Sequence, residues 1–294
     1  MTEQPSPISE HWSPGTEHLA NVVDLYLDLL AKALTRDLFE DNDEIAGVPS
    51  GPFERTWKQR LGDRVGPALR RVGYELVRKR PYDPEARALG RDWPARAETM
   101  TGLRRIANAR ACIESTLRDD VPGDIIETGV WRGGMCIFMR GVLKAHGVTD
   151  RSVWLADSFQ GLPAADPVRF PEVASMHLEN YDYLAIALDN VRHNFERYGL
   201  LDEQVRFIPG WFNESLPNAP VRELAVLRLD GDLYDSTMDA LEALYPKLSS
   251  GGYCIVDDYI VEVCRQAVHD YRRAHDITET IEDIDGTAAF WRRS

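Results

Sequence analysis

Four aspartates follow two apolar segments of the sequence, at the points where those segments end. The first segment, residues 224–229, is apolar except for Arg228, and the second spans residues 253–256. The four carboxylates belong to Asp230, Asp232, Asp257 and Asp258. Carboxylates that converge at one edge of a sheet repel each other strongly in a low dielectric unless a cation lies between them. Because hard divalent cations prefer such oxygen ligands, the pattern predicts a Mg²⁺ site, although Asp232 or Asp258 taken alone could instead cap a helix.

A glycine turn and a further aspartate follow two earlier apolar segments. Residues 125–128 lead into Gly129, and residues 153–156 lead into Asp157. A carboxylate at the end of the second strand commonly accepts hydrogen bonds from the ribose hydroxyls of an adenosine cofactor. Asp157 alone could be a turn residue, but with a glycine turn on the preceding strand it indicates a nucleoside site. The GxGxxG pattern of nicotinamide sites is absent, which argues against a dinucleotide.

The elements that must position these residues alternate regularly from about residue 99 onward. Short apolar strands are separated by helices, and the strands lack polar alternation, which implies a parallel sheet buried on both faces. The sequence therefore predicts a doubly wound α/β fold, in which the carboxyl ends of the strands meet at one edge. The expected strands cover 125–130, 153–157, 205–209, 224–230 and 253–256, and the expected helices cover 135–145, 184–198 and 236–248.

Both ends of the chain depart from this alternation. Residues 1–95 are interpreted as an α-helical N-terminal extension that covers the core or makes subunit contacts, with helices at 22–34 and 67–77. Residues 96–294 are expected to form the domain that contains the predicted cofactor and metal sites. Near the other end, residues 278–284 and 287–293 flank Asp285-Gly286, which predicts a C-terminal antiparallel hairpin with a tight two-residue turn.

The charge, hydropathy and cysteine content of the chain argue against several classes of protein. The formal net charge of −14 disfavours a nucleic-acid partner, since it repels the phosphate backbone. No apolar run approaches the roughly 20 residues that cross a bilayer, and the polar start does not resemble a signal peptide, so we expect a cytoplasmic protein without a membrane partner. The four cysteines form no CxxC pair and are predicted to be buried free thiols.

Five stretches, in order, resemble the macrocin O-methyltransferase family, whose members methylate sugar hydroxyls of macrolide and aminocoumarin antibiotics. The resemblance covers roughly residues 99–293. It implies a class I methyltransferase (Rossmann-like) fold, S-adenosylmethionine, Mg²⁺ and a glycosylated small-molecule substrate. The matching stretches are ETGVWRGG (127–134), DSFQGLP (157–163), GWFNESLP (210–217), RLDGDLY (228–234) and GGYCIVDDY (251–259).

The resemblance also implies roles for individual residues. The methionine end of the cofactor would lie against Glu127, Thr128 and Gly129, with Trp131 also at the cofactor. The ribose would lie on Asp157 with Ser158 beside it, and the adenine near Gly210 and Trp211. Asp230, Asp257 and Asp258 match the metal ligands, and Asp232 matches a proposed general base, with Asp230 the other candidate for a catalytic role.

These groups would suffice for methylation of a hydroxyl, because Mg²⁺ lowers the barrier to losing its proton and a carboxylate can take that proton. Two alternatives stay open on the sequence: a metal-dependent hydrolase, and a non-catalytic subunit that binds the cofactor. We also expect a homo-oligomer, a dimer or higher. His177, within residues 166–181, is a further candidate for contact with the substrate, since that segment could fold over the site.

Overall fold

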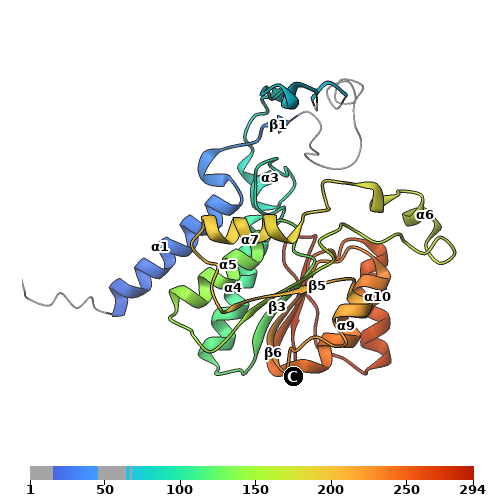
Figure 1. Ribbon diagram of the computed structural model, residues 1–294. Coiled ribbons are helices and arrows are strands. Elements are labelled where there is room, and N and C mark those ends of the chain that lie inside the picture. Colours follow the sequence, from blue (N-terminus) through green and yellow to red (C-terminus); the bar gives the residue numbers. More distant parts are fainter. Residues whose placement is uncertain (1–15, 46–63, 67) are drawn as a thin grey trace, which may run out of the picture.

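The computed structural model describes residues 16–45, 64–66 and 68–294, and its centre is a seven-stranded sheet (Figure 1). The strand order is β5-β4-β3-β6-β7-β9-β8. The first strand of this sheet, β3, lies in its interior, and the later strands are added first on one side of it and then on the other. This order agrees with the doubly wound sheet that the sequence predicts. Its strands are β3 (Asp124–Thr128), β4 (Val153–Asp157), β5 (Val205–Pro209), β6 (Leu224–Leu229), β7 (Leu248–Val256), β8 (Glu282–Asp283) and β9 (Ala289–Arg292).

The five strands from β3 to β7 pair in parallel, as the unbroken apolar patterns predict. Every residue of β6 is buried, including Arg228. The strand order reverses between β3 and β6, which are neighbours although β4 and β5 lie between them in the chain. In open α/β sheets the ligand binds at the carboxyl ends of the strands beside such a reversal.

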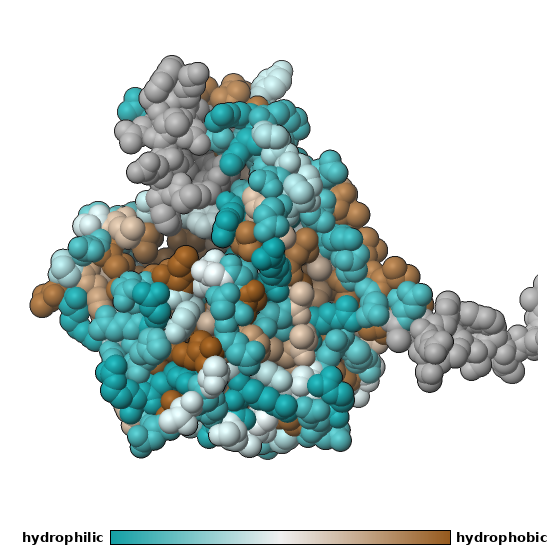
Figure 2. Space-filling model, turned by 180° about the vertical axis from the view of Figure 1, so that it is seen from behind, coloured by the Kyte–Doolittle hydropathy of each residue, from teal (hydrophilic) through white to brown (hydrophobic). Residues whose placement is uncertain are grey.

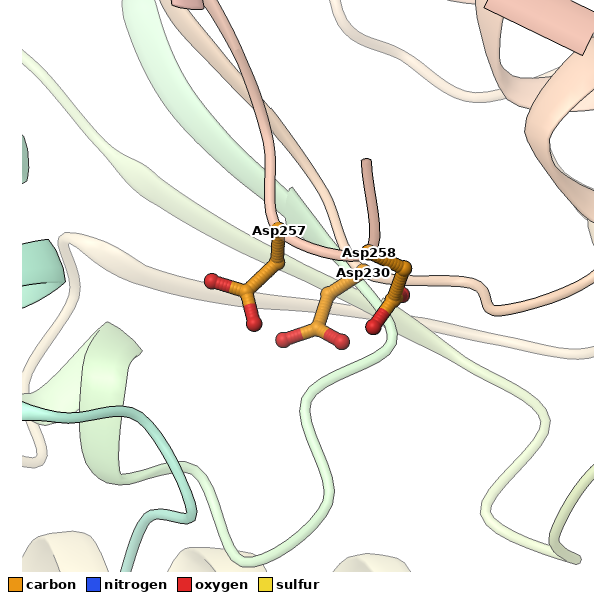
Figure 3. A group of neighbouring side chains, drawn as sticks. All are labelled: Asp230, Asp257 and Asp258. Atoms are coloured by element: carbon orange, nitrogen blue, oxygen red, sulfur yellow. The ribbon is translucent and has the colours of Figure 1, made fainter. Parts of the chain in front are cut away.

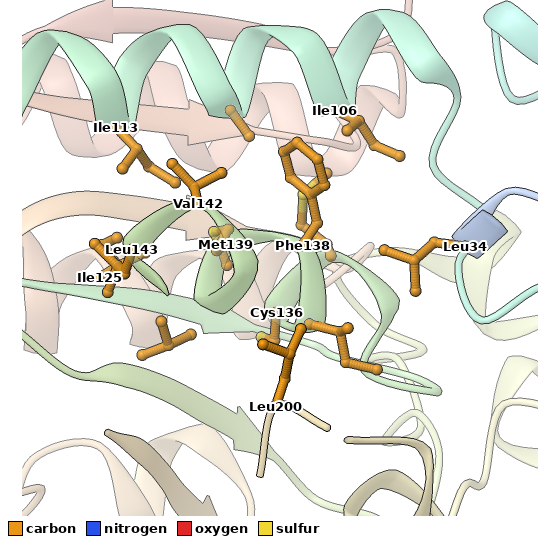
Figure 4. Packing of buried hydrophobic residues seen from close by; sticks show 14 of the residues in the cluster. Leu34, Ile106, Ile113, Ile125, Cys136, Phe138, Met139, Val142, Leu143 and Leu200 are labelled. Carbon is orange, nitrogen blue, oxygen red and sulfur yellow. The ribbon is translucent and has the colours of Figure 1, made fainter. Parts of the chain in front are cut away.

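Helices cover both faces of this sheet and divide the core into two clusters. One cluster packs α4 and α5 onto the sheet, with Ile106 and Ile113 of α4 against Phe138 and Val142 of α5 (Figure 4). The other packs α9 and α10 on the opposite face, around Leu241 and Val268. The helices are α4 (Leu103–Arg118), α5 (Gly134–Ala145), α7 (Leu188–Arg197), α9 (Tyr234–Leu244) and α10 (Glu262–Ala274).

The expected helix boundaries are partly wrong. The helix predicted over residues 184–198 begins only at Leu188 as α7, and the one predicted over 236–248 ends at Leu244. A short 3-10 helix, η3 (Tyr245–Lys247), follows α9, and Leu248 already belongs to β7. Between β4 and α7 lie α6 (Pro171–Ala174) and η2 (Leu178–Asn180), and α8 (Phe212–Ser215) follows β5.

Within the N-terminal extension, α1 (Thr16–Leu34) is part of the main core. Leu27, Leu30 and Leu34 are buried in the same cluster as α4 and α5. The other side of α1 exposes Val22, Leu25 and other apolar side chains, and Figure 2 shows hydrophobic residues at the surface on this side of the molecule.

The predicted helix over residues 67–77 is wrong in its second half. The described part of this stretch is helical only to Arg71, and Gly73 follows with a positive φ of 85°. Val77 pairs with Ile45 in a small antiparallel sheet, which the sequence did not predict. That sheet consists of β1 (Glu44–Ile45) and β2 (Val77–Arg78), preceded by η1 (Asp37–Phe39) and followed by α3 (Pro84–Ala88).

The antiparallel hairpin is present, but its turn is longer than predicted. The backbone N–H of Ile284 donates to the carbonyl oxygen of Ala288 at 2.9 Å, so Asp285 and Gly286 lie inside a wider loop. The Asp285 side chain is fully buried instead of exposed at a turn, because it forms an ion pair with Arg105. Among the residues described, no helix is long and apolar enough to span a membrane. All four cysteines are free and buried, as predicted.

Candidate active site

Three of the predicted metal ligands meet at the carboxyl ends of β6 and β7. These strands are parallel neighbours, with Leu229 opposite Val256, so the residues that follow them come together. Asp230, Asp257 and Asp258 each offer one carboxylate oxygen, and these oxygens lie within 4.8 Å of one another. The Asp230 carboxylate lies between the other two (Figure 3).

Burial and mutual repulsion shift the protonation of this cluster. Burial raises the pKa of Asp230 to about 6, and the charge of Asp257 adds to this effect while Arg228 opposes it. Burial, followed by the charges of Asp232, Asp230 and Asp257, raises the pKa of Asp258 well above its ordinary value. Groups of like charge in a low dielectric are expected to behave in this way, and a divalent cation would relieve the repulsion.

Asp232 completes the acidic cluster from the loop after β6. Its backbone has a positive φ of 56°, and its N–H donates to Oδ2 of Asp258 at 2.9 Å. Burial, together with the charges of Asp230 and Asp257, raises the pKa of the Asp232 carboxyl to about 7. All four aspartates singled out in the sequence therefore lie at one place.

Two buried arginines, which the sequence analysis did not assign to the site, lie under the cluster. Arg228 pairs with Asp230 at 2.7 Å and with Asp257, and Arg105 of α4 pairs with the other oxygen of Asp257. Although burial alone would raise it, these two guanidinium groups hold the pKa of Asp257 below its ordinary value. An arginine in an otherwise apolar buried strand requires buried counter-charges, so Arg228 itself was the signal that could have predicted this arrangement.

Glu127 lies at the end of β3 and is almost completely buried. One carboxylate oxygen pairs with Arg228, and the other accepts a hydrogen bond from the Cys136 thiol at 2.7 Å. Burial raises the pKa of Glu127 to about 7, against the opposing charge of Arg228. Both oxygens thus have a partner within the protein, which the sequence did not predict for a residue expected to face the cofactor.

The turn after β3 has a backbone that only glycine fits at its first position. Gly129 has a φ of 82°, and a Cβ there would lie 1.7 Å from the carbonyl oxygen of Asp230. Trp131 also has a positive φ, 46°, and its indole N–H donates to the carbonyl oxygen of Tyr183 at 2.9 Å. The buried Thr128 hydroxyl has no hydrogen-bond partner in the described part of the chain.

Asp157 ends β4 beside this turn and holds two loops together. One oxygen accepts the backbone N–H of Val130 at 2.7 Å, and the other accepts that of Phe159 at 2.7 Å. Burial raises the pKa of Asp157, and these hydrogen bonds oppose the shift. The Ser158 hydroxyl donates to the carbonyl oxygen of Gly161 at 2.7 Å, so it shapes the loop that follows.

The expected adenine residues lie after β5, next to Asp157. The N–H of Gly210 donates to the carbonyl oxygen of Asp157 at 2.9 Å, and its φ of 131° lies in the region that favours glycine. Trp211 directly precedes α8. The structure thus brings the predicted cofactor residues to the ends of β3, β4 and β5, beside the aspartate cluster at the ends of β6 and β7.

The candidate His177 lies in the segment between β4 and α7. It precedes η2 with a φ of 50°, and Nδ1 lies 3.1 Å from the Glu179 carboxylate. Its side chain is 68% exposed, so in this structure it is a surface residue with a local partner. Its contact with a substrate stays a prediction.

A family model and similar known proteins all point to O-methyltransferases. Residues 23–293 match the model of the family described as Macrocin-O-methyltransferase (TylF). The chain is 50% identical over 273 residues to 8-demethyl-8-(2,3-dimethoxy-alpha-L-rhamnosyl)-tetracenomycin-C 4'-O-methyltransferase of Streptomyces olivaceus, covering 92% of this chain and 93% of that protein. It is 46% identical over 275 residues to mycinamicin III 3''-O-methyltransferase of Micromonospora griseorubida, covering 92% and 97%.

A solved structure agrees with these relatives. The O-methyltransferase NovP superposes with a TM-score of 0.78 at 45% identity, covering 92% of this chain and 99% of NovP. The resemblance noted in the sequence is therefore confirmed, and so is the predicted fold class. The chain belongs to the macrocin O-methyltransferase family and is an O-methyltransferase.

Proposed function

We propose that this O-methyltransferase transfers a methyl group from S-adenosylmethionine to a sugar hydroxyl of a glycosylated natural product, in antibiotic biosynthesis, with the help of Mg²⁺. The observation that carries the proposal is the convergence of Asp230, Asp257 and Asp258 beside the loops after β3 and β4. A hydroxyl held over the cation would thereby lie next to a methyl donor bound at those loops.

The cofactor would lie along the ends of β3, β4 and β5. Glycine at 129 and 210 keeps the backbone turns tight, and the unpartnered Thr128 hydroxyl leaves a polar group available in this region. A carboxylate has about four acceptor sites, so Asp157 can accept ribose hydroxyls while keeping its two backbone partners. Trp131, Ser158 and Trp211 would shape the loops around it.

The aspartate cluster fits Mg²⁺ by the chemistry of its donors. Three carboxylate oxygens within 4.8 Å of one another are hard ligands. Burial, and after it the charges of the neighbouring aspartates, raises the pKa of Asp230 and of Asp258, and a cation would offset both effects. When bound there, Mg²⁺ would withdraw electron density from a sugar hydroxyl and make its proton easier to remove.

The protein's own groups then complete the reaction. Asp232, whose backbone N–H donates to Asp258, would accept the proton of the hydroxyl as the hydroxyl oxygen forms a bond to the methyl carbon. The bond from that carbon to the sulfonium sulfur would break, so the two products would be S-adenosylhomocysteine and the methyl ether. The remaining contribution is the in-line positioning of the two reactants.

The substrate class is supported by the relatives. The name of the Streptomyces olivaceus enzyme specifies a rhamnosyl-tetracenomycin, and that of the Micromonospora griseorubida enzyme specifies mycinamicin III. A third relative, 46% identical over 273 residues, is demethyldecarbamoylnovobiocin O-methyltransferase of Streptomyces niveus. We infer a sugar with free neighbouring hydroxyls, because two adjacent oxygens could contact one cation.

The test is to incubate the protein with S-adenosylmethionine and a panel of glycosylated antibiotics that have free vicinal hydroxyls, and to follow the products by mass spectrometry. We expect the mass of one methyl group to be added to the sugar, a loss of product with excess chelator, and recovery when Mg²⁺ is restored. Full turnover in chelator would contradict the metal requirement. Cleavage of the substrate by water, without any need for S-adenosylmethionine, would instead indicate a metal-dependent hydrolase.

A further inference from the structure

We propose that Arg228 is a positioning residue that joins the cofactor end of β3 to the metal end of β6 and β7, and that Arg105 and Asp285 support the metal end alone. This inference rests on the proposed function, since it concerns how the chain holds the residues that would bind S-adenosylmethionine and Mg²⁺.

The placement of Arg228 is the first observation. In the sheet register it lies directly opposite Glu127 of β3 on one side and Ile255 of β7 on the other. Its guanidinium pairs with Glu127, Asp230 and Asp257, and it also donates to the Thr101 hydroxyl at 3.1 Å. The planar five-donor fork of arginine suits such a bridge, whereas the ammonium group of lysine is a single point of charge.

The second observation is that Arg105 reaches Asp257 from a different element. Arg105 lies on α4 and pairs with Oδ2 of Asp257, while Arg228 pairs with Oδ1. Arg105 Nε lies 3.1 Å from Asp285, whose side chain is fully buried and whose other oxygen accepts the N–H groups of Thr287 and Ala288. No contact joins Arg105 to Glu127 in the described structure.

These contacts fix the direction in which Asp257 can bind a metal ion. Each of its oxygens is held by one guanidinium group, which limits rotation of the carboxylate. One of these oxygens lies within 4.8 Å of a carboxylate oxygen of Asp230. Partners that hold a metal-ligating carboxylate typically contribute about 10–100-fold to metal affinity. Arg228 also holds one oxygen of Glu127, so a change at this one residue affects both ends of the site.

The experiment measures binding of MgCl₂ alone and of S-adenosylhomocysteine alone by calorimetry, in variants first shown to be folded by circular dichroism. In Arg228→Lys, which keeps the charge but loses the fork, we expect the Kd for Mg²⁺ to rise by about 10–100-fold, and the Kd for S-adenosylhomocysteine to rise as well. In Asp285→Asn we expect weaker Mg²⁺ binding only, since Arg105 contacts Asp257 and not Glu127. Asp285→Asn also tests the proposal if Arg228→Lys does not fold.

The matched control is Arg140→Lys. Arg140 is also a buried arginine, paired with Asp202 at 2.6 Å, but it does not touch the aspartate cluster. Arg140→Lys should leave the Kd for Mg²⁺ and the Kd for S-adenosylhomocysteine unchanged. A change in either would mean that replacing any buried arginine disturbs the site.

The outcomes separate this inference from the proposed function. If the unchanged protein binds both ligands but Arg228→Lys and Asp285→Asn bind them equally well, the positioning role is wrong and the proposed function stands. If Mg²⁺ binds more tightly to these variants, the arginines compete with the ion and the inference is overturned. If the unchanged protein does not bind Mg²⁺, the metal dependence in the proposed function fails, and this inference fails with it.

Discussion

At the scale of single residues, the site consists of carboxylates whose environments differ although their residue type is the same. Asp257 is held by two arginines, while Asp258 lies beside Asp232 and Asp230 and accepts the backbone N–H of Asp232. Aspartates that lie close together therefore differ in how readily they lose a proton and bind a cation. Two predictions test the roles of individual aspartates.

The first prediction concerns the cofactor. We expect Asp157→Ala to weaken binding of S-adenosylhomocysteine in calorimetry, because the carboxylate orders the loops after β3 and β4 and would accept the ribose hydroxyls. Hydrogen bonds to a charged group are each worth about 1.5–3 kcal/mol. Asp83→Ala is the control, since Asp83 also accepts two backbone N–H groups but caps α3, which supplies none of the residues assigned to the cofactor. Equal cofactor affinity in both variants would remove Asp157 from the site.

The second prediction separates ligand from base. Asp257→Asn should raise the Mg²⁺ concentration needed for half-maximal activity, because an amide oxygen is a poorer ligand than a carboxylate. Asp232→Asn should instead lower turnover by roughly 10²–10⁴, the usual effect of a positioned general base, at unchanged Mg²⁺ affinity. Recovery of Asp232→Asn by added Mg²⁺ would show that Asp232 is a ligand and that the base is another residue.

At the scale of secondary-structure elements, the sequence predicted the central strands better than the helices. The bounds of β4 and β5 match the expectation, since turn residues on both sides of a short apolar run leave little choice of where the strand begins and ends. The helix expected over residues 67–77 failed at Gly73, a signal present in the sequence, where Tyr74 donates back to the carbonyl oxygen of Leu69. The pairing of Val77 with Ile45 joins distant parts of the chain, so local spacing could not predict it.

The third prediction concerns the two faces of α1. Leu30 is 6% exposed and packs in the main core, whereas its neighbour Leu29 is 52% exposed. Leu30→Ala should lower the free energy of unfolding by about 2–5 kcal/mol, the usual cost of removing a buried leucine side chain. Leu29→Ala should change it by only about 0.5 kcal/mol or less. Chemical denaturation of both variants would measure this, and equal losses would mean that α1 packs differently.

At the scale of the whole molecule, the sequence could predict that four aspartates share one edge of the sheet, because the topology of parallel strands requires it. It could not predict that Arg105 pairs with Asp257, or that Asp285 pairs with Arg105. Arg105 lies on a helix before the first strand of the large sheet. Asp285 is followed by Gly286, and this pair of residues predicts a turn. Only the packing of α4 and the hairpin onto the same sheet brings these two side chains together.

The fourth prediction concerns assembly. Val22, Leu25 and Leu29 are about half exposed or more along one side of α1, and we expect this side to contact another copy of the chain. Leu25→Glu combined with Leu29→Glu should then lower the molar mass measured by light scattering after size-exclusion chromatography, without loss of helical signal. Leu34, on the buried side of α1, is not changed in this design. A monomeric unchanged protein would contradict the expectation.

The position of Asp285 in the chain also has a consequence for the order of events during synthesis. Domains fold largely as units while the chain emerges from the ribosome, and β9 pairs with β7 only after residues 289–292 have been made. Until Asp285 emerges, Arg105 lacks one of its two carboxylate partners and β7 has an unpaired edge. A released chain that ends before Asp285 should therefore be cut by protease near β7 far more readily than the full chain, although the segments for every other strand up to β7 are already present.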